Sequence, residues 1–171
     1  NCTLTGAAVA LYDIHKKFKI EELRIATYQA VSGAGKSAMR QLETELEHYL
    51  KRGAVPELKD RKFPHPIAFN LFPQVGGFDR NGISVEENKV IAELKKIWSS
   101  PGLKISVTAV RVPVLRCHSL AVWAKTEKKW SLGELRSTLA KTTGLEFFSD
   151  PYKYPTPLAA VKTSGVKAGR L

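Results

Sequence analysis

Two side chains could supply the nucleophile and the acid–base group of a covalent mechanism. Cys2 stands at the start of a segment with helical spacing, where the positive end of a helix dipole favours a thiolate. His118 carries an imidazole suited to proton transfer near neutral pH. Each also has an ordinary explanation, because a buried cysteine behaves as a small hydrophobe and a lone histidine is more often a satisfied structural residue. The residue types alone leave both explanations open.

Three charged side chains could bind an ionic ligand. Arg111 lies inside a valine-rich segment, and a buried guanidinium needs a partner. That partner is either a structural carboxylate or a ligand carboxylate held in a bidentate fork. Glu86 and Lys89 are three residues apart on an expected helix and share one face. They form either an exposed ion pair or part of a binding site.

The stretch Ala26–Lys36 is a further candidate. Leu23 and Ile25 alternate with polar or small residues as in a strand, and the sequence then passes through Ser32-Gly33-Ala34-Gly35. Small residues allow a tight turn, and a following helix presents unpaired N–H groups to an anion. The alternative is an ordinary strand-to-helix connection.

The remaining pattern predicts the elements that position these residues. Asn1 or Thr3 could cap the start of the first helix. Capping boxes at Ser84–Glu87 and Ser131–Glu134 indicate the starts of two further helices. Helices are expected over 4–18, 34–52, 84–98 and 131–144, the second ending at Gly53, and strands over 20–31, 67–72, 104–115, 118–126 and 145–148. Residues 54–66 and the tail are expected to be mostly loop. This order predicts one α+β domain with a mixed, largely antiparallel sheet and helices packed on one face.

Composition narrows the function classes. The 171 residues are 43% hydrophobic and 25% charged, as in ordinary globular domains. The net charge of +11 is compatible with nucleic acid, a membrane surface or anionic small molecules, but the basic residues are scattered and not interleaved with aromatics. Cys2 and Cys117 are too few for a disulfide framework or a zinc site, which indicates a reducing compartment and no metal. No membrane span or signal peptide is expected, and a chain that starts on Asn is expected to be a fragment or a processed product.

Several segments together resemble the aspartate-semialdehyde dehydrogenases. The matching stretches occur in the expected order over nearly the whole chain: residues 1–3, 26–35, 66–74, 81–82, 86–89, 111–119 and 154–158. Leu120 departs from the family pattern, where an acidic residue is usual, and residues 162–168 are diverged. The resemblance implies the fold of a glyceraldehyde-3-phosphate-dehydrogenase-like C-terminal catalytic domain.

The resemblance also implies catalytic roles. Cys2 corresponds to the nucleophile that forms an acyl-thioester, and His118 corresponds to the general acid–base. Gln29 corresponds to the residue that orients the substrate and the thioester. Ser32 and Gly33 correspond to backbone contacts of the NADP cofactor.

The substrate-binding residues follow from the same resemblance. Arg111 corresponds to the residue that binds the substrate α-carboxylate, and Glu86 to the one that holds its amino group. Lys89 corresponds to a phosphate contact, and Asn1 belongs to the substrate site. The implied reaction is the NADPH-dependent reductive dephosphorylation of L-aspartyl-4-phosphate to L-aspartate 4-semialdehyde, with release of phosphate, in lysine, threonine and methionine biosynthesis.

Residues 1–171 then correspond to the catalytic and dimerisation domain, without the NADP-binding domain. We therefore expect NADP to be bound mainly by that absent domain, and the chain to be inactive by itself. The resemblance further implies a homodimer that binds neither nucleic acid nor membrane. It implies a cytoplasmic location, or a plastid if the source is a plant or an alga.

Other functions remain open from the sequence. A reductase of N-acetyl-glutamyl phosphate would use similar chemistry, but its substrate has no free ammonium to pair with Glu86. A non-catalytic basic module for nucleic acid predicts a clustered positive face and binding that weakens steeply with salt. A dimer-forming scaffold is the fourth possibility.

Overall fold

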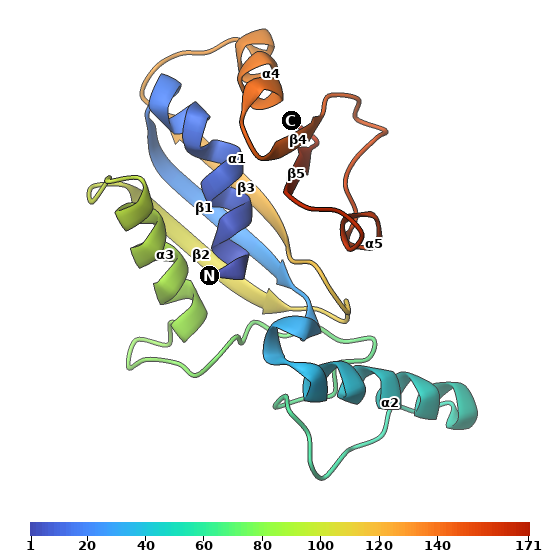
Figure 1. The fold of residues 1–171 in the computed structure, drawn as a ribbon. Coiled ribbons are helices and arrows are strands. Elements are labelled where there is room, and N and C mark those ends of the chain that lie inside the picture. Colours follow the sequence, from blue (N-terminus) through green and yellow to red (C-terminus); the bar gives the residue numbers. More distant parts are fainter.

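A three-stranded mixed sheet lies at the centre of the fold, with helices along one face (Figure 1). The structure is a computed structural model and describes residues 1–171. The elements are α1 (Cys2–Phe18), β1 (Ile20–Gln29), the 3-10 turn η1 (Val31–Ala34), α2 (Lys36–Arg52), α3 (Val85–Ile97), β2 (Lys104–Arg111), β3 (Ser119–Thr126), α4 (Leu132–Lys141), β4 (Leu145–Phe148), α5 (Pro157–Ala160) and β5 (Val166–Gly169).

The strand order β2-β1-β3 gathers three chain segments at one end of the sheet. β1 pairs with β2 in parallel, so that Gln29 lies opposite Arg111 at the carboxyl ends of both strands. β1 pairs with β3 in the antiparallel sense, so that Tyr28 lies opposite Ser119 at the start of β3. The amino end of α1 reaches the same end of the sheet (Figure 1).

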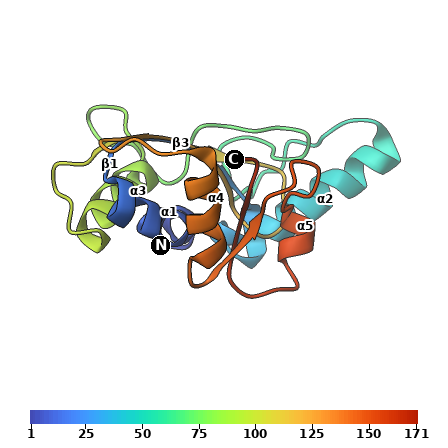
Figure 2. The same cartoon turned by 90° about the horizontal axis from the view of Figure 1, so that it is seen from above.

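The two faces of the sheet have different environments. Leu23, Ile25 and alternate residues after them are buried, and the side chains between them, such as Arg24 and Tyr28, are largely exposed. The covered face forms the main core with α1, α3 and α4, which lie together on one side of the strands (Figure 2). The other face of the sheet has no covering element. This separation follows from the two-residue period of a strand.

The α+β fold with a mixed sheet and helices on one face is confirmed, but the pairing is less antiparallel than we expected. β4 and β5 form a separate two-stranded parallel sheet, so only one of the three strand pairings is antiparallel. The tail is mostly loop, as expected, but it also contains α5 and β5, which the sequence did not predict. Pairing with β4 orders β5, and such a long-range contact leaves little trace in the local sequence.

The predicted helix ends are largely confirmed. The Asn1 side chain accepts hydrogen bonds from the first turn of α1, and Gly53 ends α2 in the left-handed conformation. Both predicted capping boxes are present. Glu87 does more than cap α3, because its carboxylate also accepts the N–H of Ala109 on the open edge of β2. This bond ties α3 to the sheet.

The predicted strand over residues 67–72 is absent, and a turn takes its place. The buried Glu45 carboxylate accepts the N–H groups of Ile67 and Ala68, each at 2.7 Å, and Phe69 has a left-handed φ of 59°. Only Phe72 forms a β-bridge, with Arg111. Glu45 thus supplies the hydrogen bonds that a neighbouring strand would have supplied.

The predicted boundaries shift by a few residues elsewhere. Residues 31–34 are a 3-10 turn rather than the end of a strand and the start of a helix, and β2 ends at Arg111 rather than at residue 115. α4 ends at Lys141, with Thr142 as its cap, before Gly144. β2 ends two residues before Pro113, whose nitrogen has no N–H to donate to a neighbouring strand.

His15 joins the carboxyl ends of α1 and α3. Its ring stacks on Trp98 with centroids 4.9 Å apart, and its Nδ1 accepts the N–H of Ile20. The neutral ring therefore carries its proton on Nε2, which lies 2.9 Å from Ser100 Oγ. Burial lowers the pKa of His15.

This environment predicts a fold that weakens in mild acid. A histidine whose pKa is lower in the folded state contributes its full stability above the unfolded value of about 6.5, and loses it as the pH falls towards the folded value. We expect the thermal midpoint to decrease between pH 7.5 and 5.5, and His15→Gln to remove part of that decrease. His48→Gln, at an exposed position, is the control. Equal pH slopes in all three proteins would show that His15 does not contribute.

Candidate active site

The site is built around the Ala30 peptide, where β1 leaves the sheet. Ala30 is fully buried and follows the last paired residue of β1, so its polar main-chain groups need partners other than strands. Its N–H donates to Nδ1 of His118 at 3.0 Å, and its carbonyl accepts from Nη1 of Arg111 at 2.6 Å. One residue thereby holds two of the predicted functional side chains.

Cys2 and His118 form a direct pair, 116 residues apart in sequence. Cys2 lies in the first turn of α1. Its Sγ is 3.2 Å from His118 Nε2. Because Nδ1 already accepts the Ala30 N–H, the neutral ring carries its proton on Nε2 and presents it to sulfur. This proton and the positive end of the helix dipole both favour negative charge on sulfur.

Burial and the Arg111 cation favour a neutral His118 ring. Burial lowers the pKa of His118, and the Arg111 cation lowers it further, while Glu86 opposes both. A proton added at Nδ1 would also have to displace the Ala30 N–H. The ring is therefore held as a hydrogen-bond donor towards Cys2.

Arg111 is 5% exposed and has no carboxylate partner in the chain. Its Nη1 bonds to the Ala30 carbonyl and lies 3.5 Å from the Gln29 carbonyl, and its guanidinium lies over the Phe63 ring at 5.5 Å. None of the ion pairs includes Arg111, and its buried Nε has no partner. Burial lowers the pKa of Arg111, and the negative charges of Glu86 and Cys2 oppose that effect. Of the two explanations from the sequence, the arrangement favours a ligand carboxylate.

Gln29 and Glu86 complete the cluster. Gln29 is 1% exposed, and its Nε2 donates to Glu86 Oε1 at 3.1 Å and to Thr3 Oγ1. Glu86 lies in the first turn of α3, where the capping box fixes the helix end. The structure therefore brings together five of the predicted residues: Cys2, Gln29, Glu86, Arg111 and His118.

Asn1 and Lys89 lie near this cluster without joining its hydrogen bonds. Asn1 caps α1, and its own backbone nitrogen is 3.6 Å from Glu93 of α3. Lys89 is exposed on α3, one turn after Glu86, and makes no hydrogen bond or ion pair. Their roles as ligand contacts remain predictions.

Ser32 and Gly33 lie in η1, and their N–H groups are already used. The Ser32 N–H donates to the Leu115 carbonyl, and the Gly33 N–H donates to the Ala30 carbonyl. Gly33 is exposed, and a Cβ there would lie 3.1 Å from Cε1 of His118. The residues fit a cofactor contact through the Ser32 hydroxyl and the bare Gly33 backbone beside His118, but not through their N–H donors.

Three residues of the site, Thr3, Ala30 and Phe63, were not predicted from the sequence. Ala30 acts through main-chain groups and Phe63 comes from an expected loop, so their residue types gave no signal. Thr3 did carry one, because it shares the helical spacing of the buried residues Ala7 and Ile14. A polar side chain on the buried face of a helix needs a partner.

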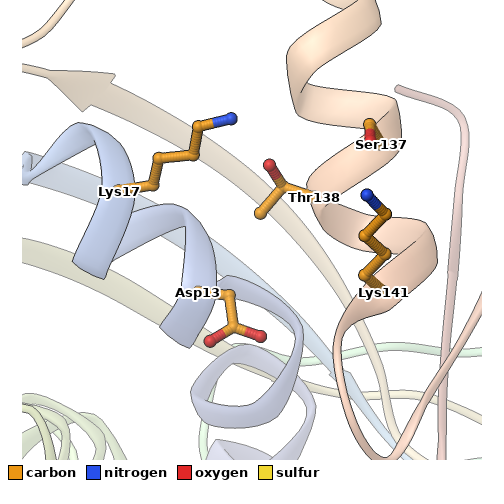
Figure 3. A pocket seen from close by; sticks show the side chains of 5 residues that line it. All are labelled: Asp13, Lys17, Ser137, Thr138 and Lys141. Atoms are coloured by element: carbon orange, nitrogen blue, oxygen red, sulfur yellow. The ribbon is translucent and has the colours of Figure 1, made fainter.

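A shallow pocket between α1 and α4 is separate from this cluster (Figure 3). It is lined by Asp13, Lys17, Ser137, Thr138 and Lys141. Asp13 lies eleven residues after Cys2 on the same helix, which is about 17 Å along its axis. No group of three His, Cys, Asp or Glu side chains is arranged to hold a metal ion, and none of the helices is both long and apolar enough to cross a membrane.

Comparison with known proteins gives consistent matches. Residues 11–171 match the family model described as semialdehyde dehydrogenase, dimerisation domain. The chain is 37% identical over its whole length to the aspartate-semialdehyde dehydrogenase of Aquifex aeolicus, of which it covers 50%. It thus spans about half the length of the curated relatives it matches.

Solved structures agree with that match. The crystal structure of aspartate semialdehyde dehydrogenase II from Vibrio cholerae superposes with a TM-score of 0.93 at 33% identity, over 99% of this chain and 50% of that one. A structure of the Vibrio cholerae aspartate semialdehyde dehydrogenase II complexed with ASA gives a TM-score of 0.88 at 34% identity. The superposition covers 94% of this chain and 46% of that chain.

The position of Gly33 predicts that Gly33→Ala disturbs the Cys2–His118 pair. The new Cβ would push on the imidazole and lengthen the hydrogen bond to sulfur. Because hydrogen bonds to charged groups contribute more than neutral ones, we expect alkylation of Cys2 by iodoacetamide to slow at least about threefold. Mass spectrometry distinguishes Cys2 from Cys117. Gly77→Ala, where a Cβ meets nothing within 4 Å, is the control. An unchanged rate in Gly33→Ala would contradict the predicted displacement.

Proposed function

This chain belongs to the semialdehyde dehydrogenase family, through the dimerisation domain that residues 11–171 match, and we propose that it carries the thioester-forming site of an aspartate-semialdehyde dehydrogenase. The contact that carries the proposal is Cys2 Sγ at 3.2 Å from His118 Nε2, beside a buried Arg111 without a carboxylate partner. The proposed reaction converts L-aspartyl-4-phosphate to L-aspartate 4-semialdehyde. The relatives' names and the ASA complex of the Vibrio cholerae enzyme support this substrate.

Charge complementarity supports an amino-acid substrate. Arg111 offers the guanidinium protons of its two Nη atoms that are not bonded to main-chain carbonyls to the α-carboxylate. Glu86 offers a carboxylate to the α-ammonium. This pairing disfavours an N-acetylated substrate, which has no ammonium to offset the Glu86 charge.

The covalent step follows from the position of sulfur. The Cys2 thiolate attacks the acyl carbon, the carbon–sulfur bond forms, and the bond to phosphate oxygen breaks with its electrons on the leaving phosphate. The Nε2–H of His118 faces the sulfur. From that position it would also donate to the acyl oxygen as negative charge develops there. Lys89 would contact the phosphate group, and Asn1 would contribute to the substrate site.

The proposed cofactor is NADP, with Ser32 and Gly33 as this chain's contacts. When bound, the reduced cofactor NADPH would supply the hydride that reduces the thioester, and NADP+ would accept a hydride in the reverse direction. Since the chain covers half of each curated relative, we propose that a cofactor domain outside these 171 residues provides most of the NADP site. The chain alone would then be inactive. The free thiols of Cys2 and Cys117 suit a reducing compartment such as the cytoplasm.

The uncovered sheet face is the proposed homodimer surface. Its centre is a shallow hollow between Arg24, Ala26 and Thr108, and the Arg24 guanidinium lies 5.0 Å from the Trp123 ring centroid. Trp123 is half exposed, and a large aromatic at the centre of an uncovered face is typical of an interface. The family model's description as a dimerisation domain supports this use of the face.

The covalent mechanism predicts that Cys2→Ala abolishes turnover. In the full-length protein, oxidation of L-aspartate 4-semialdehyde with phosphate and NADP+ should fall at least about a thousandfold, because no other group can form the thioester. Cys117→Ser is the control and should retain activity within about twofold. Substantial activity in Cys2→Ala would exclude the proposed nucleophile.

The dimer proposal predicts that Ala26→Arg weakens self-association. The new arginine would lie beside Arg24 on each copy, and the cations of the two copies would repel each other across a two-fold interface. We expect the dissociation constant to increase at least about tenfold in sedimentation analysis. Ser137→Arg on the exposed part of α4 is the control. If Ala26→Arg dimerises like the unchanged protein, the interface lies elsewhere.

A further inference from the structure

We propose that Thr3 is a positioning residue for Gln29, whose carboxamide it holds with the oxygen turned towards the ligand. The inference rests on the proposed function only for the identity of that ligand. The contact itself lies entirely within this chain. Thr3 belongs to α1 and Gln29 to the end of β1, so the bond links the helix that carries Cys2 to the strand end that holds His118 and Arg111.

The orientation of the Gln29 carboxamide follows from its partners. The Glu86 carboxylate can only accept hydrogen bonds, so the Gln29 atom that faces it at 3.1 Å must be Nε2. Thr3 Oγ1 accepts the second proton of the same Nε2. Both amide protons are then used, and neither a flipped nor a rotated carboxamide can satisfy the two acceptors together.

The Gln29 oxygen is the group left over. Oε1 makes no hydrogen bond within the chain, yet it is not among the sealed polar atoms that lack a partner. It is therefore reachable although Gln29 is 1% exposed overall. An unpartnered acceptor next to the Glu86 carboxylate favours a ligand with several donor protons, such as a primary ammonium. A carbonyl or carboxylate oxygen would meet repulsion there.

Thr3 is suited to this task because it has little freedom. It is 1% exposed, and its backbone N–H is fixed by the Asn1 cap at 2.9 Å. A β-branched side chain in a helix has few χ1 rotamers, so the hydroxyl is held with little loss of entropy on ligand binding. Thr3→Val keeps the shape and removes the hydroxyl, and Thr3→Ser keeps the hydroxyl and removes a methyl group.

The test compares these two variants in the full-length protein, with L-aspartate 4-semialdehyde, phosphate and NADP+. We expect Thr3→Val to raise KM for the semialdehyde at least about tenfold, because a buried amide proton loses its acceptor and the carboxamide loses its fixed orientation. Thr3→Ser should stay within about threefold of the unchanged protein. The difference in KM between Thr3→Val and Thr3→Ser should not be matched by a difference between their thermal midpoints. Equal losses in both variants would show that Thr3 acts through packing, and an unimpaired Thr3→Val would overturn the proposal.

A second measurement needs neither a variant nor turnover. In the NMR spectrum of the unchanged protein, the two side-chain amide protons of Gln29 should exchange with water at least about tenfold more slowly than those of the exposed Asn81. Exchange as fast as at Asn81 would refute the Thr3–Gln29 contact. If the full-length protein shows no dehydrogenase activity but the Gln29 amide protons exchange slowly, the Thr3–Gln29 contact stands and only the proposed substrate is rejected.

Discussion

Burial of the Ala30 peptide is the constraint on which the rest of the site depends. β1 stops pairing with its neighbours at Gln29, and the next peptide lies in the interior, where unpaired N–H and C=O groups are costly. His118 and Arg111 satisfy these groups. The requirement that fixes the end of the strand therefore also fixes an imidazole and a guanidinium, and the fold maintains the geometry of the site without a ligand.

Mixed pairing explains how Arg111 and His118 come to share this peptide. β2 runs parallel to β1 and ends at Arg111, and β3 runs antiparallel and begins just after His118. The connection between them crosses the end of β1, where the carbonyls of Val114 and Leu115 accept the N–H groups of Val31 and Ser32. A purely parallel or antiparallel three-stranded sheet would have placed one of the two side chains at the far end.

The sequence predicted correctly the starts of three helices, which depend on residues close to one another in the chain. The capping boxes at Ser84 and Ser131 and the cap at Asn1 involve residues within one helical turn, and all three are present. The turn at 67–72 and the pairing of β5 depend on Glu45 and β4, which lie about twenty residues away, and sequence patterns missed both. The same holds for the site, because Cys2 and His118 were recognisable by type, whereas Ala30 works through its main chain.

Glu86 and Glu87 divide two tasks between adjacent positions of one helical turn. Glu87 points into the protein, where it caps α3 and bonds the edge of β2, and Glu86 points to Gln29 and the ligand site. Side chains that differ by about 100° around the helix can be exchanged independently. The charge at position 86 can therefore change without loss of the α3 capping box or of the bond to β2, although Gln29 would then lose one of its two acceptors.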